Sequence, residues 1–163
     1  MTGAIVQVSI SAGGVPNHSI ATGTVAANGI VGDAWRYPFH GGPRRAILVM
    51  TAEGIDTLAA QGFPVWYGAL GENLTTRGLD RSLLRLGQRF RAGQAVIELT
   101  QVRLPCDTLS VYGTGIQAAM YDARAQAGDA ASPVWGLSGF YASVVEPGIV
   151  RPGDRIASLG LPL

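Results

Sequence analysis

A single cysteine, Cys106, is the side chain in this sequence best suited to act as a nucleophile or to bind a soft metal. It stands in the segment Arg103-Leu104-Pro105-Cys106-Asp107-Thr108, between a predicted strand and the start of a predicted helix. A nearby guanidinium and the amides of a helix N-terminus would stabilise its thiolate, whereas Asp107 would oppose that effect. Cys106 is therefore either a working thiol or a small buried apolar residue, and this pattern leaves both open.

A second candidate site is the segment Pro38-Phe39-His40-Gly41-Gly42-Pro43-Arg44-Arg45. Two glycines let backbone N–H groups come close to an anion, and the two adjacent arginines could neutralise its charge. The alternative is a tight Gly-Gly-Pro turn with solvated arginines and a histidine that bonds the loop.

Two further segments contain polar side chains at glycine-rich turns. In Gly71-Glu72-Asn73-Leu74-Thr75-Thr76, the Glu and Asn side chains either bond the edge of a heterocycle or brace the loop backbone. In Gly29-Ile30-Val31-Gly32-Asp33, the aspartate either caps a turn or orients His40.

The composition excludes several other classes of chemistry. All twelve cationic residues are arginine, so no lysine is present to form a Schiff base or to complete a P-loop. One cysteine and two histidines are too few for a structural zinc site without carboxylates. The net charge of +1 gives no indication of a nucleic-acid-binding surface.

The elements that must position these residues are mostly strands. Alternation over Ala4 to Ser11, with Val6, Val8 and Ile10 on one face, predicts a half-buried strand. Further strands are predicted at 22–27, 45–50, 95–101 and 140–145, and after the turns at 86–90 and 152–156.

Helices are expected in only two places. One should begin at a Thr51 cap, bury Ile55, Leu58 and Ala59, and end at Gly62. The other covers 107–126 as one helix broken near Gly113 and Gly115, or as two short helices, with Ile116 and Met120 facing inward. An ordered loop is expected over 63–76. These patterns predict a mostly β fold with a few short helices and a closed or strongly curved sheet.

The length of 163 residues suits one domain, and we find no linker or domain boundary within 1–163. No stretch is long and apolar enough for a membrane helix, and the first residues lack the cationic start of a secretory signal. We therefore expect a cytoplasmic protein that has no membrane partner.

The candidate segments, taken in order, resemble the MOSC family, the domain found at the C-terminus of molybdenum-cofactor sulfurases. The resemblance spans nearly the whole chain. It is carried by Ser11-Ala12-Gly13-Gly14-Val15-Pro16, Gly29 to Asp33, His40 to Arg45, Gly71 to Thr75, Gly78-Leu79-Asp80, Arg103 to Cys106, Gly139-Phe140-Tyr141-Ala142 and Val150-Arg151-Pro152-Gly153-Asp154.

The resemblance implies a MOSC-type, barrel-like β fold that binds molybdenum cofactor (molybdopterin). It implies that Cys106 is the catalytic residue and the molybdenum ligand. We expect the cofactor-binding residues to be His40, Gly41, Gly42, Arg45, Glu72, Asn73, Arg103 and Asp33.

The chain is similar to standalone members such as bacterial N-hydroxylaminopurine reductases, which implies an oxidoreductase that reduces small N-hydroxylated substrates with electrons from a partner reductase. Two alternatives remain open at this point. One is a sulfur carrier that uses a Cys106 persulfide formed by a cysteine desulfurase, and the other is a non-catalytic cofactor carrier. A homodimer would be compatible with each of these functions.

Two positions depart from the family pattern. Asn17 stands where many members have a lysine, and Arg44 stands where the family loop often has an aspartate. The first change weakens an expected phosphate contact, and the extra cation at Arg44 would compensate for it.

Overall fold

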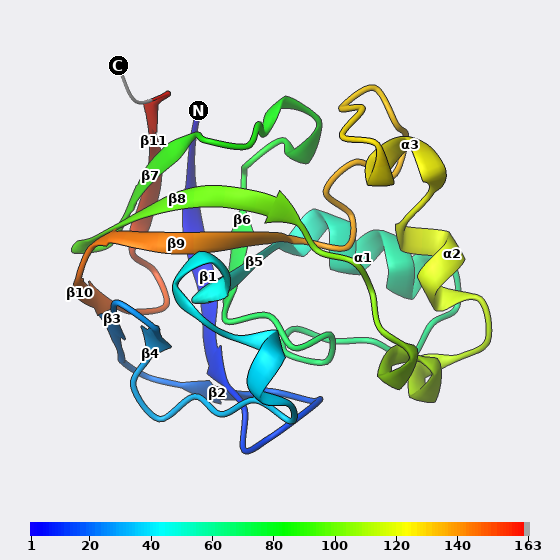
Figure 1. Ribbon diagram of the computed structural model, residues 1–163, viewed down its shortest axis with the longest axis horizontal. Coiled ribbons are helices and arrows are strands. Elements are labelled where there is room, and N and C mark those ends of the chain that lie inside the picture. Colours follow the sequence, from blue (N-terminus) through cyan, green and yellow to red (C-terminus); the bar gives the residue numbers. More distant parts are fainter. Residues whose placement is uncertain (162–163) are drawn as a thin grey trace.

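The computed structural model describes residues 1–161 and contains a closed barrel with helices along one side (Figure 1). Its strands are β1 (Thr2–Ile10), β2 (His18–Ile20), β3 (Gly23–Ala26), β4 (Gly29–Ile30), β5 (Ile47–Thr51), β6 (Leu74–Arg77), β7 (Arg89–Ala92), β8 (Ala95–Val102), β9 (Phe140–Glu146), β10 (Gly148–Val150) and β11 (Arg155–Gly160). The mostly β fold expected from the sequence is confirmed.

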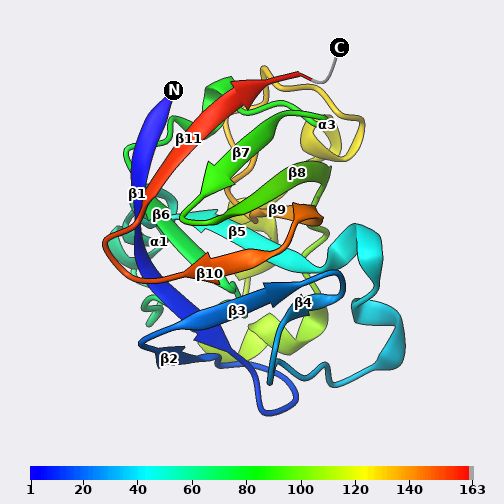
Figure 2. The same ribbon diagram turned by 90° about the vertical axis from the view of Figure 1, so that its left-hand side faces the viewer.

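Seven strands close the barrel. They follow the order β11-β7-β8-β9-β5-β6-β1, and pairing of β1 with β11 joins the two ends. Every neighbouring pair is antiparallel except β5 and β6, which are parallel. Figure 2 shows the strands wrapping round the barrel, with the small β10-β3-β4 sheet across one end. Closure leaves few exposed edges, because each barrel strand has a neighbour on both sides.

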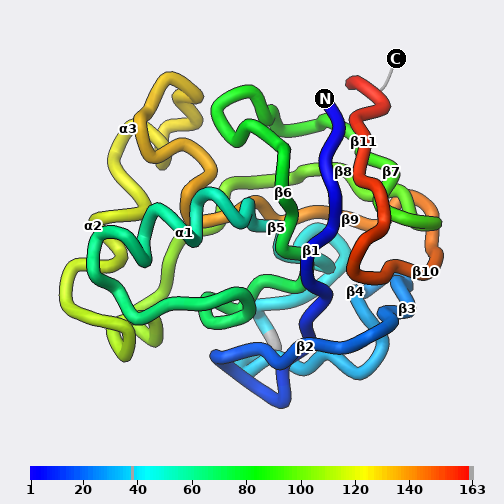
Figure 3. Tube along the Cα trace, turned by 180° about the vertical axis from the view of Figure 1, so that it is seen from behind, coloured from blue at the N-terminus to red at the C-terminus, as the bar shows by residue number. Residues whose placement is uncertain are grey.

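The helices occupy the side of the barrel where β5 and β6 pair (Figure 3). They are α1 (Ala52–Ala60), α2 (Ile116–Met120) and α3 (Ala123–Gln126). Elsewhere in the chain there are short 3-10 turns, η1 (Pro38–His40), η2 (Pro43–Arg45), η3 (Arg81–Leu83) and η4 (Asp107–Tyr112). The expected Thr51 cap is confirmed, since its hydroxyl accepts a hydrogen bond from the Gly54 amide. Ile55 and Leu58 are buried as expected, but Ala59 is exposed.

Two apolar clusters hold the molecule together. Inside the barrel, side chains such as Ile5, Phe90 and Phe140 are almost fully buried. Outside it, α1 and α2 pack Ile55, Leu58, Ile116 and Met120 against Met50 and neighbours. Burial of a large aliphatic or aromatic side chain stabilises the fold by about 1.5–3 kcal/mol, so these clusters fix the strand ends that carry the site.

Three expectations need correction. The region 63–76, expected to be a loop, ends in β6, which pairs with both β1 and β5. The inward face of β1 is formed by Ile5 and Val8, because a bulge between Ile5 and Gln7 shifts the alternation expected from Val6. The expected break of 107–126 at Gly113 and Gly115 is confirmed, since these glycines adopt φ angles of +127° and +88°, but the first part is a 3-10 turn and the rest forms two short helices.

No helix within residues 1–161 is both long and apolar enough to cross a membrane.

Candidate functional site

A cavity of about 290 Å³ opens where β1 and β8 end and where β6 begins. Several chain segments that are distant in sequence line it together. The lining residues are Ser11, Gly14, Val15, Asn17, Asp33, Ala34, Trp35, Arg36, Tyr37, His40, Arg45, Leu48, Gly71, Asn73, Gln101, Arg103, Leu104, Pro105, Cys106, Thr108 and Tyr141. The structure thus brings Cys106, Arg103, His40, Arg45, Asp33 and Asn73 to one place.

Cys106 lies in the cavity wall, partly exposed, as the residue that precedes η4. Its Sγ lies 2.6 Å from the Thr108 hydroxyl, and its carbonyl accepts hydrogen bonds from the Leu109 amide and the Gln117 side chain. The expectation of an α-helix beginning here is wrong, because η4 is a 3-10 turn. The polar group next to the thiol is therefore the Thr108 hydroxyl and not the N-terminus of an α-helix.

Arg103 is a buried cation, only 5% exposed, in the wall of the same cavity. Two hydrogen bonds fix its backbone. The Arg103 amide donates to the Gly139 carbonyl, and the Ser138 hydroxyl donates to the Arg103 carbonyl. Within residues 1–161, its buried Nη1 has no hydrogen-bond partner and its guanidinium forms no ion pair within 4.0 Å. The charge of Arg103 acts on the buried Glu72 carboxylate, but the two form no ion pair within 4.0 Å. A buried guanidinium nitrogen without a hydrogen-bond partner is costly, so this position favours an anionic ligand.

Asn73 and Asp33 form a polar bracket below the cavity. The Asn73 amide donates to the Ser9 carbonyl and, at 2.8 Å, to Asp33, while its oxygen accepts from the Leu48 amide. The second carboxylate oxygen of Asp33 accepts from the Ser11 amide at 2.7 Å. Burial raises the pKa of Asp33, and the bonds from Ser11 and Asn73 partly offset that rise.

These contacts show what each of the two side chains bonds within the protein. Asn73 commits both its amide hydrogens and its oxygen to the protein, so it braces the loop and has no free donor for a heterocycle. Asp33 ties Ser11 to Asn73, the residue before β6, and the backbone of the adjacent Ala34 also helps to lower its pKa. Within the described chain, its side chain makes no hydrogen bond to His40.

Glu72 does not line the cavity, in contrast to the expected cofactor contact. It is fully buried, and one carboxylate oxygen accepts from the Gly68 amide and the Thr75 hydroxyl. The other oxygen has no partner within residues 1–161. Burial raises the pKa of Glu72, opposed by these hydrogen bonds and by the charge of Arg103. Glu72 therefore braces its own loop.

Gly41 and Gly42 also lie outside the cavity lining, so the phosphate-binding loop expected there is not formed by their backbone. A Cβ at Gly41 would lie 2.5 to 2.7 Å from three atoms of the Trp35 indole. Gly42 has a φ angle of +106° and is the residue that precedes η2. Both glycines therefore set the shape of the segment, while His40 and Arg45 face the cavity.

His40 and Arg45 each lie beside an aromatic ring. His40 meets Tyr37 edge to face at 5.1 Å between ring centroids. The Arg45 guanidinium lies 5.6 Å from the centroid of the Tyr141 ring, a cation–π distance. Arg45 therefore adds a second cation to the cavity that contains Arg103.

The sequence reasoning missed several lining residues, chiefly the run Trp35-Arg36-Tyr37. The signal in the sequence is that two large aromatic side chains stand together between the Gly32-Asp33 turn and the Gly41-Gly42 segment. Asn17, which departs from the family pattern, also lines the cavity. Its amide donates to the carbonyls of Gly71 and Glu72, so it stabilises the neighbouring loop.

The fold and this cavity can now be set beside known proteins. A family model described as "MOSC domain" matches residues 36–157, and the chain belongs to that family of molybdenum-cofactor-associated domains. The chain is 31% identical over 129 residues to the uncharacterized protein YflK of Bacillus subtilis, a match covering 74% of this chain and 50% of YflK. It is 38% identical over 78 residues to the protein YiiM of Escherichia coli, covering 45% of this chain and 34% of YiiM.

Solved structures share the fold. The structure of YiiM from Geobacillus stearothermophilus matches with a TM-score of 0.73 at 24% identity, covering 96% of this chain and 75% of that one. The YUAD protein from Bacillus subtilis matches with a TM-score of 0.73 at 23% identity, covering 99% and 98% of the two chains. The chain thus spans about half or less of the curated relatives, but nearly all of the YUAD chain.

Proposed function

We propose that this protein binds molybdenum cofactor at its cavity and acts as an oxidoreductase that removes oxygen from N-hydroxylated compounds. One observation carries the proposal. A partly exposed cysteine and a buried arginine with an unpartnered nitrogen line the same cavity in a chain of the MOSC family.

The residues of the cavity fit such a group. A thiolate from Cys106 is a suitable soft ligand for molybdenum, and Arg103 and Arg45 would hold the anionic phosphate of the pterin. Within residues 1–161, no group of three His, Cys, Asp or Glu side chains is arranged to hold a metal ion. Cys106 would therefore be the one ligand that we propose from this chain for the metal.

When bound, the cofactor would supply the two-electron chemistry of the reaction. Cleavage of the N–O bond uses two electrons and two protons and yields an amine and water. We propose that a partner reductase delivers the electrons.

The chain's own residues would bind the cofactor and orient it in the cavity. The backbone of Arg103 is fixed by Gly139 and Ser138 and its side chain is buried in the wall, so its charge would be available to an anion. Thr108 contacts the sulfur of Cys106 and would help to position it. The Asn73–Asp33 bracket keeps the walls of the cavity together.

The direct test is turnover. Protein from a host that makes the cofactor should reduce an N-hydroxylated purine with a chemical reductant, and Cys106→Ser should lose at least about 100-fold of that rate, as a metal ligand would. No turnover by well-folded, molybdenum-loaded protein would refute the reductase. A persulfide on Cys106 after incubation with a cysteine desulfurase would instead favour sulfur transfer.

A further inference from the structure

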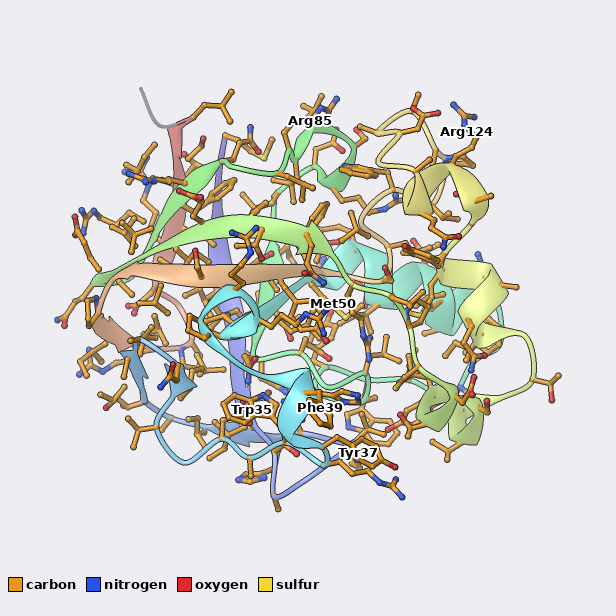
Figure 4. All side chains as sticks on the ribbon, viewed as in Figure 1. Trp35, Tyr37, Phe39, Met50, Arg85 and Arg124 are labelled. Atoms are coloured by element: carbon orange, nitrogen blue, oxygen red, sulfur yellow. The ribbon has the colours of Figure 1, made fainter. Side chains whose placement is uncertain are left out.

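The mouth of the cavity contains an aromatic surface beside a free cation. Trp35 and Tyr37 both line the cavity, although they are 39% and 46% exposed. Figure 4 shows them close together with Phe39 on the segment that follows β4. Large aromatic side chains left exposed at a cavity commonly mark a binding surface, because burying them against a ligand is favourable.

The Trp35 ring is held in a defined position. It packs so closely over Gly41 that a Cβ there would lie 2.5 Å from Cε2 of the indole. Only glycine leaves this space, so the backbone at Gly41 supports the ring. A supported and partly exposed indole is a suitable stacking surface for a planar ring.

Arg36 adds a positive charge at the same place. It lines the cavity, and its guanidinium lies 5.6 Å from the centroid of the Tyr37 ring. It forms no ion pair within the described residues, and Asp33, the sole acid in the lining, is bonded to Ser11 and Asn73. Arg36 is thus free to bind an anionic group.

Arg36 and Arg103 define two different anion positions. Arg103 is buried in the cavity wall, whereas Arg36 is exposed beside the aromatic rings at the mouth. If the buried arginine serves the cofactor, the cation at the mouth remains for the substrate.

We infer that Trp35 and Arg36 form a substrate subsite for a planar heteroaromatic ring that carries an anionic substituent. The ring stacks on Trp35 and the anion binds Arg36, so a phosphorylated N-hydroxylated base binds more tightly than the free base. This inference rests on the proposed function, because it assumes that the substrate enters beside the cofactor.

Calorimetric titration of the cofactor-loaded protein tests the subsite, with N-hydroxylated adenine and its nucleoside monophosphate as the two probes. The monophosphate should bind about fivefold more tightly, the gain of an exposed ionic contact, and Arg36→Gln should abolish that difference. Trp35→Ala should weaken the binding of both probes about tenfold because stacking is lost, and Trp35→Phe should keep most of the wild-type affinity.

Matched controls lie outside the cavity. Trp66 is 52% exposed and meets Tyr112 edge to face. Arg151 is an exposed arginine that directly follows β10. Trp66→Ala and Arg151→Gln should leave both affinities unchanged.

Two results would overturn the inference. Equal affinity for the base and its monophosphate would show that Arg36 does not bind the substrate. Loss of pterin from Trp35→Ala would assign the ring to the cofactor. Failure of the proposed function can be told apart from failure of this inference. A protein that binds the monophosphate preferentially but never reduces it would refute the reductase activity and leave the subsite in place.

Discussion

At the scale of single residues, the side chains near the cavity divide into those that face a ligand and those that hold its walls. Cys106, Arg103 and Arg45 have groups available to a ligand. Asn73 lines the cavity but its amide bonds to the protein, and Glu72 lies outside the lining, although both come from one segment expected to bind the cofactor. The Asn73 amide is saturated by the protein, whereas within residues 1–161 Arg103 keeps an Nη1 without a hydrogen-bond partner in the cavity wall.

Asn73→Ala should lower the free energy of unfolding by about 3 kcal/mol, because three hydrogen bonds at about 1 kcal/mol each are lost. Denaturant unfolding measures this. Gln126→Ala, an exposed change at the end of α3, should cost less than about 0.5 kcal/mol. Equal effects of the two substitutions would show that the Asn73 bracket contributes no stability.

Glu72 makes stability depend on pH in the opposite direction to an ion-paired carboxylate. Burial raises its pKa above the ordinary 4.5, so the folded state holds this proton more tightly than the unfolded chain does. Its contribution is fully present below the ordinary value and is lost as the pH rises through the raised one.

Glu72→Gln, which cannot ionise, should remove this loss. The difference in unfolding free energy between variant and wild type should therefore move in favour of the variant as the pH rises from about 4 to about 8. Parallel curves for the two proteins over that range would contradict a raised pKa at Glu72.

At the scale of elements, the turn before β9 connects the barrel to the site. Gly139 has a φ angle of +96°, and its carbonyl accepts the bond from the Arg103 amide. A Cβ at this position would lie 2.7 Å from Met50 Cγ and 3.0 Å from the Val49 carbonyl. The turn therefore requires glycine for its conformation and for space.

Gly139→Ala and Gly153→Ala separate these two requirements. Gly153 has a similar φ angle of +92° but nothing within 4 Å of its added Cβ. Gly153→Ala should cost about 1–2 kcal/mol for the left-handed conformation alone. Gly139→Ala should cost about 1–3 kcal/mol more for overpacking. Thermal unfolding measures both, and equal costs would show that the neighbours of Gly139 yield freely.

Elements with a strong periodic signal or a cap were predictable from the sequence. Examples are α1, with its Thr51 cap, and the continuous apolar strand β5. Strand β6 was not predictable, because its four residues follow a glycine-rich loop and are stabilised by pairing with β1 and β5. Its parallel pairing is a tertiary effect that local patterns do not encode.

At the scale of the whole molecule, the closed barrel brings segments near residues 11–17, 33–45, 71–73 and 101–108 to one cavity. Sequence order alone could nominate the segments, but it could not show which side chains turn inward. The exposed aromatic residues Trp35 and Tyr37 could likewise not be assigned to a site from the sequence, because only the structure shows the cavity that they line.

The central claim is that this cavity holds molybdenum cofactor through Cys106, with Arg103 binding its anionic part. The most direct measurement is the molybdenum and pterin content of wild type, Cys106→Ser and Arg103→Gln, each purified from a host that makes the cofactor. We expect about one molybdenum per wild-type chain, a loss of about tenfold or more in Cys106→Ser, and a lower pterin content in Arg103→Gln. Well-folded wild-type protein without molybdenum, or a Cys106→Ser variant that keeps its full content, would contradict the claim.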